Sequence, residues 1–125
     1  MPFIALVDDE EAVRKALVRL LRAAGLEAQG FPSGTALLHS IATRRPDCLV
    51  VDLHMPGMSG LEMLRQLHDR GFSVPAVIIT VAYGPHARVL CREAGASACL
   101  CKPLDETMLI DAIAAALGQS APVSR

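Results

Sequence analysis

The chain has 125 residues, 52% of them hydrophobic but only 3% aromatic, and its formal net charge is −1 at pH 7. This length predicts one domain with an aliphatic core, and the near balance of charge argues against direct nucleic-acid binding through bulk electrostatics. The first residues, MPFIALVDDE, lack the basic segment of a signal peptide, and no apolar run reaches the length of a membrane span, so we expect a cytoplasmic protein without membrane contact.

Five short apolar runs predict five β-strands. They cover residues 3–7, 26–31, 48–51, 76–79 and 98–101. The first, third and fourth runs are apolar at nearly every position, which is typical of strands in a parallel sheet that is covered on both faces.

Five amphipathic segments alternate with these runs and predict helices. They cover about residues 13–24, 33–43, 59–70, 85–94 and 105–117. Ser33, Ser59 and Asp105 are the predicted N-caps, and Glu62 completes a capping box with Ser59. Glycines are expected to follow the ends of four helices: Gly25, Gly71, Gly95 and Gly118. We therefore expect one domain over residues 1–118 and a polar tail or linker stub over residues 119–125.

The alternation of strands and helices predicts an α/β fold of the doubly wound (βα)5 type. Right-handed crossovers between parallel strands place helices on both faces of one open sheet. Ligands of such sheets bind beyond the carboxyl ends of the strands. The residues that end each strand are therefore the candidates for a functional site.

Polar side chains end four of the predicted strands. Asp8 and Asp9 follow the first, Asp52 the third, Thr80 the fourth and Lys102 the fifth. Clustered carboxylates repel one another and recruit a cation or protons, and a hard ion such as Mg²⁺ suits carboxylate oxygens. A lysine and a hydroxyl beside them suit the oxygens of a phosphoryl group. Asp52 is the best candidate for a nucleophile, with Asp8 and Asp9 as the more natural metal pair.

Each of these residues also has an ordinary structural explanation when it is taken alone. Asp8 and Asp9 would cap the first helix, and Asp52 would be a turn carboxylate before Pro56 and Gly57. Thr80 would be a plain strand end, and the residues 102–103 a plain loop. Their occurrence together at the ends of four strands favours the functional interpretation.

Four stretches, LVDDEEAVR, LVVDLHMPGMSG, VIIT and CLCKP, carry a family resemblance. In order and spacing they resemble the signature regions of the receiver domain of bacterial two-component response regulators, most of all the nitrogen-fixation regulator type. The resemblance covers residues 3–118. It implies a flavodoxin-like five-stranded parallel sheet in the order 2-1-3-4-5, and a phosphoacceptor signalling domain that catalyses only its own phosphorylation and dephosphorylation.

The resemblance also implies the site. Asp52 would accept a phosphoryl group from a phosphohistidine on a sensor histidine kinase. Asp9, with Asp8 acting largely through water, would hold Mg²⁺, and the backbone carbonyl of His54 would complete the protein ligands. The side chain of His54 is expected to face solvent at the site entrance.

Switching would follow from the same resemblance. Thr80 and Lys102 would contact the phosphoryl oxygens, and the peptide bond before Pro103 is expected to be cis. Movement of Thr80 would reshape the surface made by the fourth helix, fifth strand and fifth helix. Receivers of this kind often pair as homodimers through that surface, and the oligomeric state of this chain stays open. Cys99 stands where the family usually has an aromatic switch residue, and we expect Tyr83 to take over part of the signalling.

The four cysteines are predicted to be reduced core residues. They are Cys48, Cys91, Cys99 and Cys101, and no two have the CxxC spacing of a redox or metal motif. A thiol in a small cytosolic domain most often packs as a small apolar side chain.

Three other functions share parts of this pattern. A haloacid-dehalogenase-type phosphatase uses a strand-end aspartate but needs a second one two residues later, where this chain has His54. A flavodoxin-like cofactor binder needs a phosphate-cradling loop after the first strand, and here that loop is acidic. A receiver-fold interaction module that works without phosphorylation remains the alternative, favoured only by Cys99.

Overall fold

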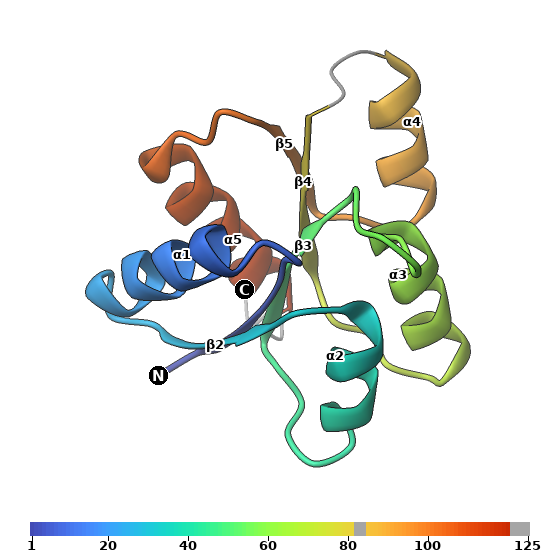
Figure 1. The fold of residues 1–125 in the computed structure, drawn as a ribbon, viewed down its shortest axis with the longest axis horizontal. Coiled ribbons are helices and arrows are strands. Elements are labelled where there is room, and N and C mark those ends of the chain that lie inside the picture. The colour runs from blue at the N-terminus through green and yellow to red at the C-terminus, as the bar shows by residue number, and fades with distance from the viewer. Residues whose placement is uncertain (82–84, 121–125) are drawn as a thin grey trace.

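The computed structural model describes residues 1–81 and 85–120. It has five strands and five helices in strict alternation (Figure 1). The strands are β1 (Phe3–Val7), β2 (Glu27–Phe31), β3 (Cys48–Asp52), β4 (Ala76–Thr80) and β5 (Ala98–Cys101). The helices are α1 (Glu11–Ala23), α2 (Gly34–Ser40), α3 (Gly60–Asp69), α4 (Pro85–Glu93) and α5 (Glu106–Ser120).

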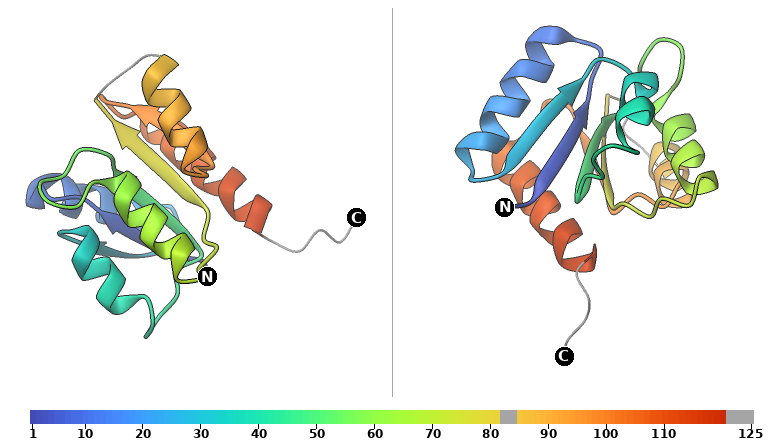
Figure 2. Two further views of the ribbon diagram at one scale, coloured as in Figure 1. Left: turned by 90° about the vertical axis from the view of Figure 1, so that its right-hand side faces the viewer. Right: turned by 90° about the horizontal axis from the view of Figure 1, so that it is seen from below.

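The strands form one parallel sheet in the order β2-β1-β3-β4-β5, which confirms the predicted fold. α1 and α5 cover one face of the sheet, and α2, α3 and α4 cover the other (Figures 1 and 2). β3 lies at the centre between β1 and β4, whereas β5 is an edge strand that pairs with β4.

The sheet separates two apolar clusters. Because successive strand residues point to opposite faces, Val50 packs with α1 and α5 while its neighbour Val51 packs with α2, α3 and α4. On the first face Leu21 and Ile113 are almost fully buried, and on the second Met63 is. Both faces of β3 are therefore core, which explains why its sequence is apolar without alternation.

The helix ends follow local chemistry. Ser33 Oγ accepts a hydrogen bond from the backbone N–H of Ala36 at 3.1 Å, and Ser59 and Glu62 form the predicted capping box. Asp105 Oδ1 accepts from the N–H of Met108 at 3.1 Å. Gly25, with φ +88°, adopts the left-handed conformation that lets the chain leave α1.

Two predicted helix ends are wrong. α5 continues through Gly118 to Ser120, since Gly118 does not take up the left-handed conformation that ends a helix. The second helix ends at Ser40 rather than residue 43, because the chain tightens there: Ser40 Oγ donates to the carbonyl of Leu37, and the N–H of Thr43 donates to Ser40. Among the described helices, none is both long and apolar enough to cross a membrane.

Candidate functional site

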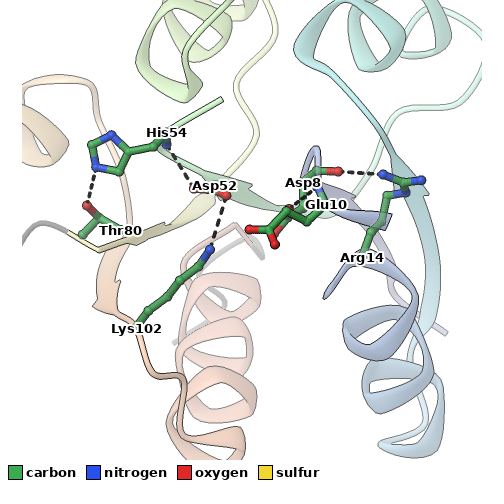
Figure 3. Close-up of polar contacts among 7 residues, drawn as sticks. All are labelled: Asp8, Glu10, Arg14, Asp52, His54, Thr80 and Lys102. Carbon is green, nitrogen blue, oxygen red and sulfur yellow. Dashed lines mark hydrogen bonds and ion pairs between the residues drawn. The ribbon is translucent and has the colours of Figure 1, made fainter. Parts of the chain in front are cut away.

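The carboxyl ends of the strands bring four predicted site residues to one edge of the sheet: Asp8, Asp52, Thr80 and Lys102 (Figure 3). β1 and β3 pair with Val7 beside Val51, so Asp8 and Asp52 emerge from neighbouring strands at the same level. Thr80 ends β4, and its strand partner is Cys101, so Lys102 follows directly beyond it. The structure therefore places Asp52 between an acidic strand end and a basic one.

Three carboxylates gather on the acidic side. Asp8, Asp9 and Asp52 each offer an oxygen, and these oxygens all lie within 4.8 Å of one another. Asp8 and Asp52 are buried, with 2% and 4% of their surface exposed, while Asp9 is exposed. Burial raises the pKa of Asp8, and the charges of Asp52 and Asp9 raise it further, against the opposing effects of the Glu10 N–H and the charge of Lys102.

This cluster fits a divalent cation. Oxygen ligands from carboxylates are those that a hard ion accepts, and a bound cation would offset the burial and the mutual repulsion that raise the pKa of Asp8. The Asp8 carboxylate is oriented by the backbone N–H of Glu10, which donates to Oδ1 at 2.9 Å. Arg14 donates to the carbonyl of Asp8 at 2.9 Å and fixes the backbone there.

Asp52 is held at both of its oxygens. The backbone N–H of His54 donates to Oδ1 at 3.0 Å, and Lys102 Nζ lies 3.4 Å from Oδ2. Lys102 keeps 25% of its side-chain surface exposed. The peptide bond between Lys102 and Pro103 is cis, and the N–H of Lys102 donates to the carbonyl of Thr80 at 2.8 Å. A buried carboxylate thus faces a partly exposed ammonium group across the site.

The loop after Asp52 depends on two glycines. Gly57 has φ +76°, a conformation that residues with a side chain rarely adopt. A Cβ on Gly60 would lie 2.8 Å from the carbonyl oxygen of Asp52 and 2.8 Å from a methyl group of Val51. Gly60 therefore lets α3 begin directly against the backbone of the candidate nucleophile, and its N–H donates to the carbonyl of Leu53 at 3.2 Å.

The side chain of His54 makes a contact that sequence reasoning missed. It is exposed overall, as expected, yet its Nε2 lies 3.1 Å from Thr80 Oγ1 (Figure 3). Thr80 itself is almost fully buried. A residue two positions beyond a strand end can reach the end of the next strand in a parallel sheet, and that spacing was the available signal.

Of the two predicted switch residues beyond Thr80, the structure describes only Cys99. Cys99 lies in β5, is half-buried, and packs toward α4, with its Sγ 3.2 Å from Cys91 Sγ. Tyr83 lies outside the described residues. All four cysteines are free in the structure.

Comparison with known proteins supports the same interpretation. The family model for the response regulator receiver domain matches residues 4–114. The transcriptional regulatory protein FixJ of Azorhizobium caulinodans is 35% identical over 122 residues, which are 98% of this chain and 58% of that protein. The DNA-binding transcriptional regulator NtrC of Klebsiella pneumoniae is 39% identical over 100 residues, 80% of this chain and 21% of that protein. The chain thus spans from about a fifth to three fifths of these relatives.

Solved structures agree. The crystal structure of FixJ-N has a TM-score of 0.90 and a sequence identity of 35%, and the alignment covers 98% of this chain and 98% of that chain. A response regulator receiver protein from Burkholderia phymatum has a TM-score of 0.84 at 37% identity, with 98% of this chain and 100% of that chain covered. The matched family model, the relatives and the fold therefore agree that this chain belongs to the response regulator receiver domains of two-component systems, and that it is a signalling domain of the nitrogen-fixation regulator type.

Proposed function

We propose that this chain accepts a phosphoryl group on Asp52 from a sensor histidine kinase, in the presence of Mg²⁺. One observation carries the proposal: the buried Asp52 carboxylate has Lys102 Nζ 3.4 Å from one oxygen, and it also has an oxygen within 4.8 Å of oxygens of Asp8 and Asp9. A nucleophile that lies between a cation and a metal-binding cluster has what phosphoryl transfer needs, namely positioning and neutralisation of charge.

Mg²⁺ would be held by the carboxylates of Asp8, Asp9 and Asp52 and by the backbone carbonyl of His54. The first three are supported by the convergence of their oxygens and by the raised pKa of Asp8. When it is bound, the ion would neutralise phosphoryl oxygens and the repulsion between the carboxylates. The carbonyl of His54 follows from the family resemblance alone.

The chain's own residues would perform the rest. An oxygen of Asp52 forms the bond to phosphorus as the bond to the histidine nitrogen of the donor breaks. Lys102 would move its ion pair from the Asp52 carboxylate to a phosphoryl oxygen, which its flexible, partly exposed side chain permits. The hydroxyl of Thr80 would donate a hydrogen bond to another oxygen. Hydrolysis of the acyl phosphate by water would return Asp52 to its free form.

Signalling would begin at Thr80. In the described state its hydroxyl lies 3.1 Å from His54 Nε2, so a phosphoryl group on Asp52 would compete with the imidazole for it. The resulting shift of the β4 end would change the surface made by α4, β5 and α5, as a population shift driven by local charge. We propose that this surface also forms a phosphorylation-dependent homodimer. The role of Tyr83 in the same switch stays a prediction.

The output would be the regulation of transcription in the cytoplasm. Two relatives are named as transcriptional regulators, and they are longer than this chain. The proposal gives residues 1–118 the receiver role and residues 119–125 the role of a tail or linker, with no direct contact to nucleic acid or membrane.

Intact mass spectrometry after incubation with acetyl phosphate and Mg²⁺ tests the proposal. We expect the addition of one phosphoryl group, and none in an Asp52→Asn variant or in the presence of EDTA. Asp69→Asn is the matched control, since Asp69 ends α3 away from the site, and it should be phosphorylated as the wild type is. Folded protein that gains no mass would refute phosphoacceptor function and favour an interaction module that works without phosphorylation.

A further inference from the structure

Two thiols meet between α4 and β5, outside the phosphoacceptor site. Cys91 lies on α4 and is buried, and Cys99 lies on β5 and is half-buried. Their Sγ atoms are 3.2 Å apart, with the Cys91 thiol donating to Cys99. The contact joins a helix to an edge strand, and both elements belong to the surface of α4, β5 and α5 that the proposed function uses for signalling.

The other two cysteines have no thiol neighbour of this kind. Cys48 Sγ donates to the carbonyl of Leu49 at 3.5 Å within the opposite face of the sheet. Cys101 Sγ donates to the carbonyl of Lys102 at 3.4 Å. Among the four cysteines, Cys91 and Cys99 are therefore the pair whose sulfur atoms lie close enough to react with each other.

We propose that Cys91 and Cys99 form a reversible intramolecular disulfide when the protein meets a two-electron oxidant of the peroxide class. The Sγ atoms need to approach from 3.2 Å to the disulfide length of about 2.05 Å, a movement that side-chain rotation and a small shift of α4 supply. A reductant of the dithiol class would restore both thiols.

The order of the two steps follows from exposure. Peroxide reaches the half-buried Cys99, whose sulfur attacks an oxygen, breaks the O–O bond and becomes a sulfenic acid as water leaves. The Cys91 sulfur then attacks the Cys99 sulfur, the S–O bond breaks, and the Cys91 proton leaves with the sulfenic hydroxyl as water. In sum, two thiols and one peroxide give one disulfide and two waters.

The environment of Cys91 assigns it the second step. Burial, followed by the hydrogen bond and the charge of Cys99, raises the pKa of Cys91 to about 12, so it resists direct attack on an oxidant. Cys91 is therefore the thiol that reacts second, against the sulfenic acid beside it.

The disulfide would tie α4 to β5. β5 is half-buried along its whole length and pairs on one side only, so this edge has few restraints of its own. A covalent link across it would suppress local opening of α4. The formation of the disulfide does not depend on the proposed function, because no phosphoryl donor takes part.

The test uses the full chain without a phosphoryl donor. The protein is treated with hydrogen peroxide, denatured and alkylated with N-ethylmaleimide, and its intact mass is measured by mass spectrometry. We expect two fewer alkylated cysteines and the loss of two hydrogens in the monomer, both reversed by dithiothreitol, with peptide mapping joining residues 91 and 99. Hydrogen exchange in α4 should slow by roughly tenfold or more.

Three variants separate this pair from general thiol oxidation. Cys99→Ser, a half-buried substitution expected to fold, and Cys91→Ser should each abolish the link. The matched control Cys101→Ser, which changes a half-buried cysteine on the same strand, should retain it. Disulfide-linked dimers in place of the monomer link, a link that survives in Cys99→Ser, or oxidation of the thiols without any link between residues 91 and 99 would each overturn the proposal.

Discussion

β3 and β5 belong to one sheet, but they are built differently. β3 lies between β1 and β4 and is buried at all five of its positions, whereas β5 pairs with β4 alone and is half-buried at all four of its positions. β3 ends in the candidate nucleophile Asp52, and β5 ends just before Lys102. The two charges of the Asp52–Lys102 pair thus come from the end of a fully buried central strand and from the residue after a half-buried edge strand.

The difference suggests a division of work. A nucleophile must hold its geometry within fractions of an ångström, and two flanking strands with core on both faces supply that rigidity. A surface that signals must have two accessible arrangements, and regions with few buried contacts supply those. The chemistry is expected at the sheet centre, and the response at the α4–β5 edge.

Shortening one leucine in each strand tests this comparison most strongly. Leu49→Ala in β3 removes a fully buried side chain and should lower the free energy of unfolding by about 2–5 kcal/mol. Leu100→Ala in β5 removes a half-buried side chain and should lower it by at most about 2 kcal/mol. Urea denaturation measures both, and equal losses would show that the edge is as tightly packed as the centre.

Gly60 tests how closely packed the centre is beside Asp52. Gly60→Ala forces a Cβ to within 2.8 Å of the Asp52 carbonyl oxygen, so it should destabilise the protein by about 1–3 kcal/mol and slow phosphorylation of Asp52. Gly118→Ala is the matched control: it lies in α5 with nothing within 4 Å of the added Cβ, and it should stabilise by about 0.5–1 kcal/mol. Thermal unfolding of both variants checks the opposite signs.

The pattern of residues was sufficient to predict a parallel sheet and its strand-end residues, whereas the order of the strands came from the family resemblance. Apolar runs mark β1, β3 and β4 because both faces are buried, and the polar residues that end them must then meet at one edge. The roles of these residues came from the family resemblance, since each one alone is also an ordinary cap, turn or strand end.

Contacts between side chains from different elements could not be predicted in the same way. The His54–Thr80 and Cys91–Cys99 contacts depend on rotamers and on how α4 and the loop after β3 pack. The prediction of a helix end was wrong at Gly118, because a glycine is compatible with either a helix or a turn. The neighbouring sequence did not distinguish the two.

Asp8→Asn tests the electrostatic cost of the centre. The pKa of Asp8 is raised above its ordinary value of 3.8. At pH values between 3.8 and the raised pKa, the folded protein therefore binds more protons than the unfolded chain. The stabilisation from this group is complete below pH 3.8 and is lost as pH rises through the raised pKa. In EDTA, Asp8→Asn should therefore be more stable than wild type at pH 7, and the difference should shrink on acidification.

Added Mg²⁺ should reverse that order at pH 7 by stabilising wild type more than Asp8→Asn. Urea midpoints across a pH series give both results. A variant that is less stable than wild type in EDTA at neutral pH would mean that the Asp8 carboxylate is stabilised in the folded state, which contradicts the raised pKa.

Lys102→Gln gives the smallest expected effect and links the two regions. The Lys102 ammonium lies 3.4 Å from Asp52 Oδ2, so it competes with a cation for the same carboxylate and lowers the pKa of Asp8. Removal of this charge should tighten Mg²⁺ binding about fivefold. That factor is equivalent to ~1 kcal/mol, the size of the repulsion between two unit charges that are partly screened by solvent. The same substitution should slow phosphorylation. Lys15→Gln removes an exposed lysine paired with Glu11 and should leave Mg²⁺ affinity unchanged. Calorimetric titration decides: if both variants bind Mg²⁺ as wild type does, the edge strand does not tune the central carboxylates, and the two regions act independently.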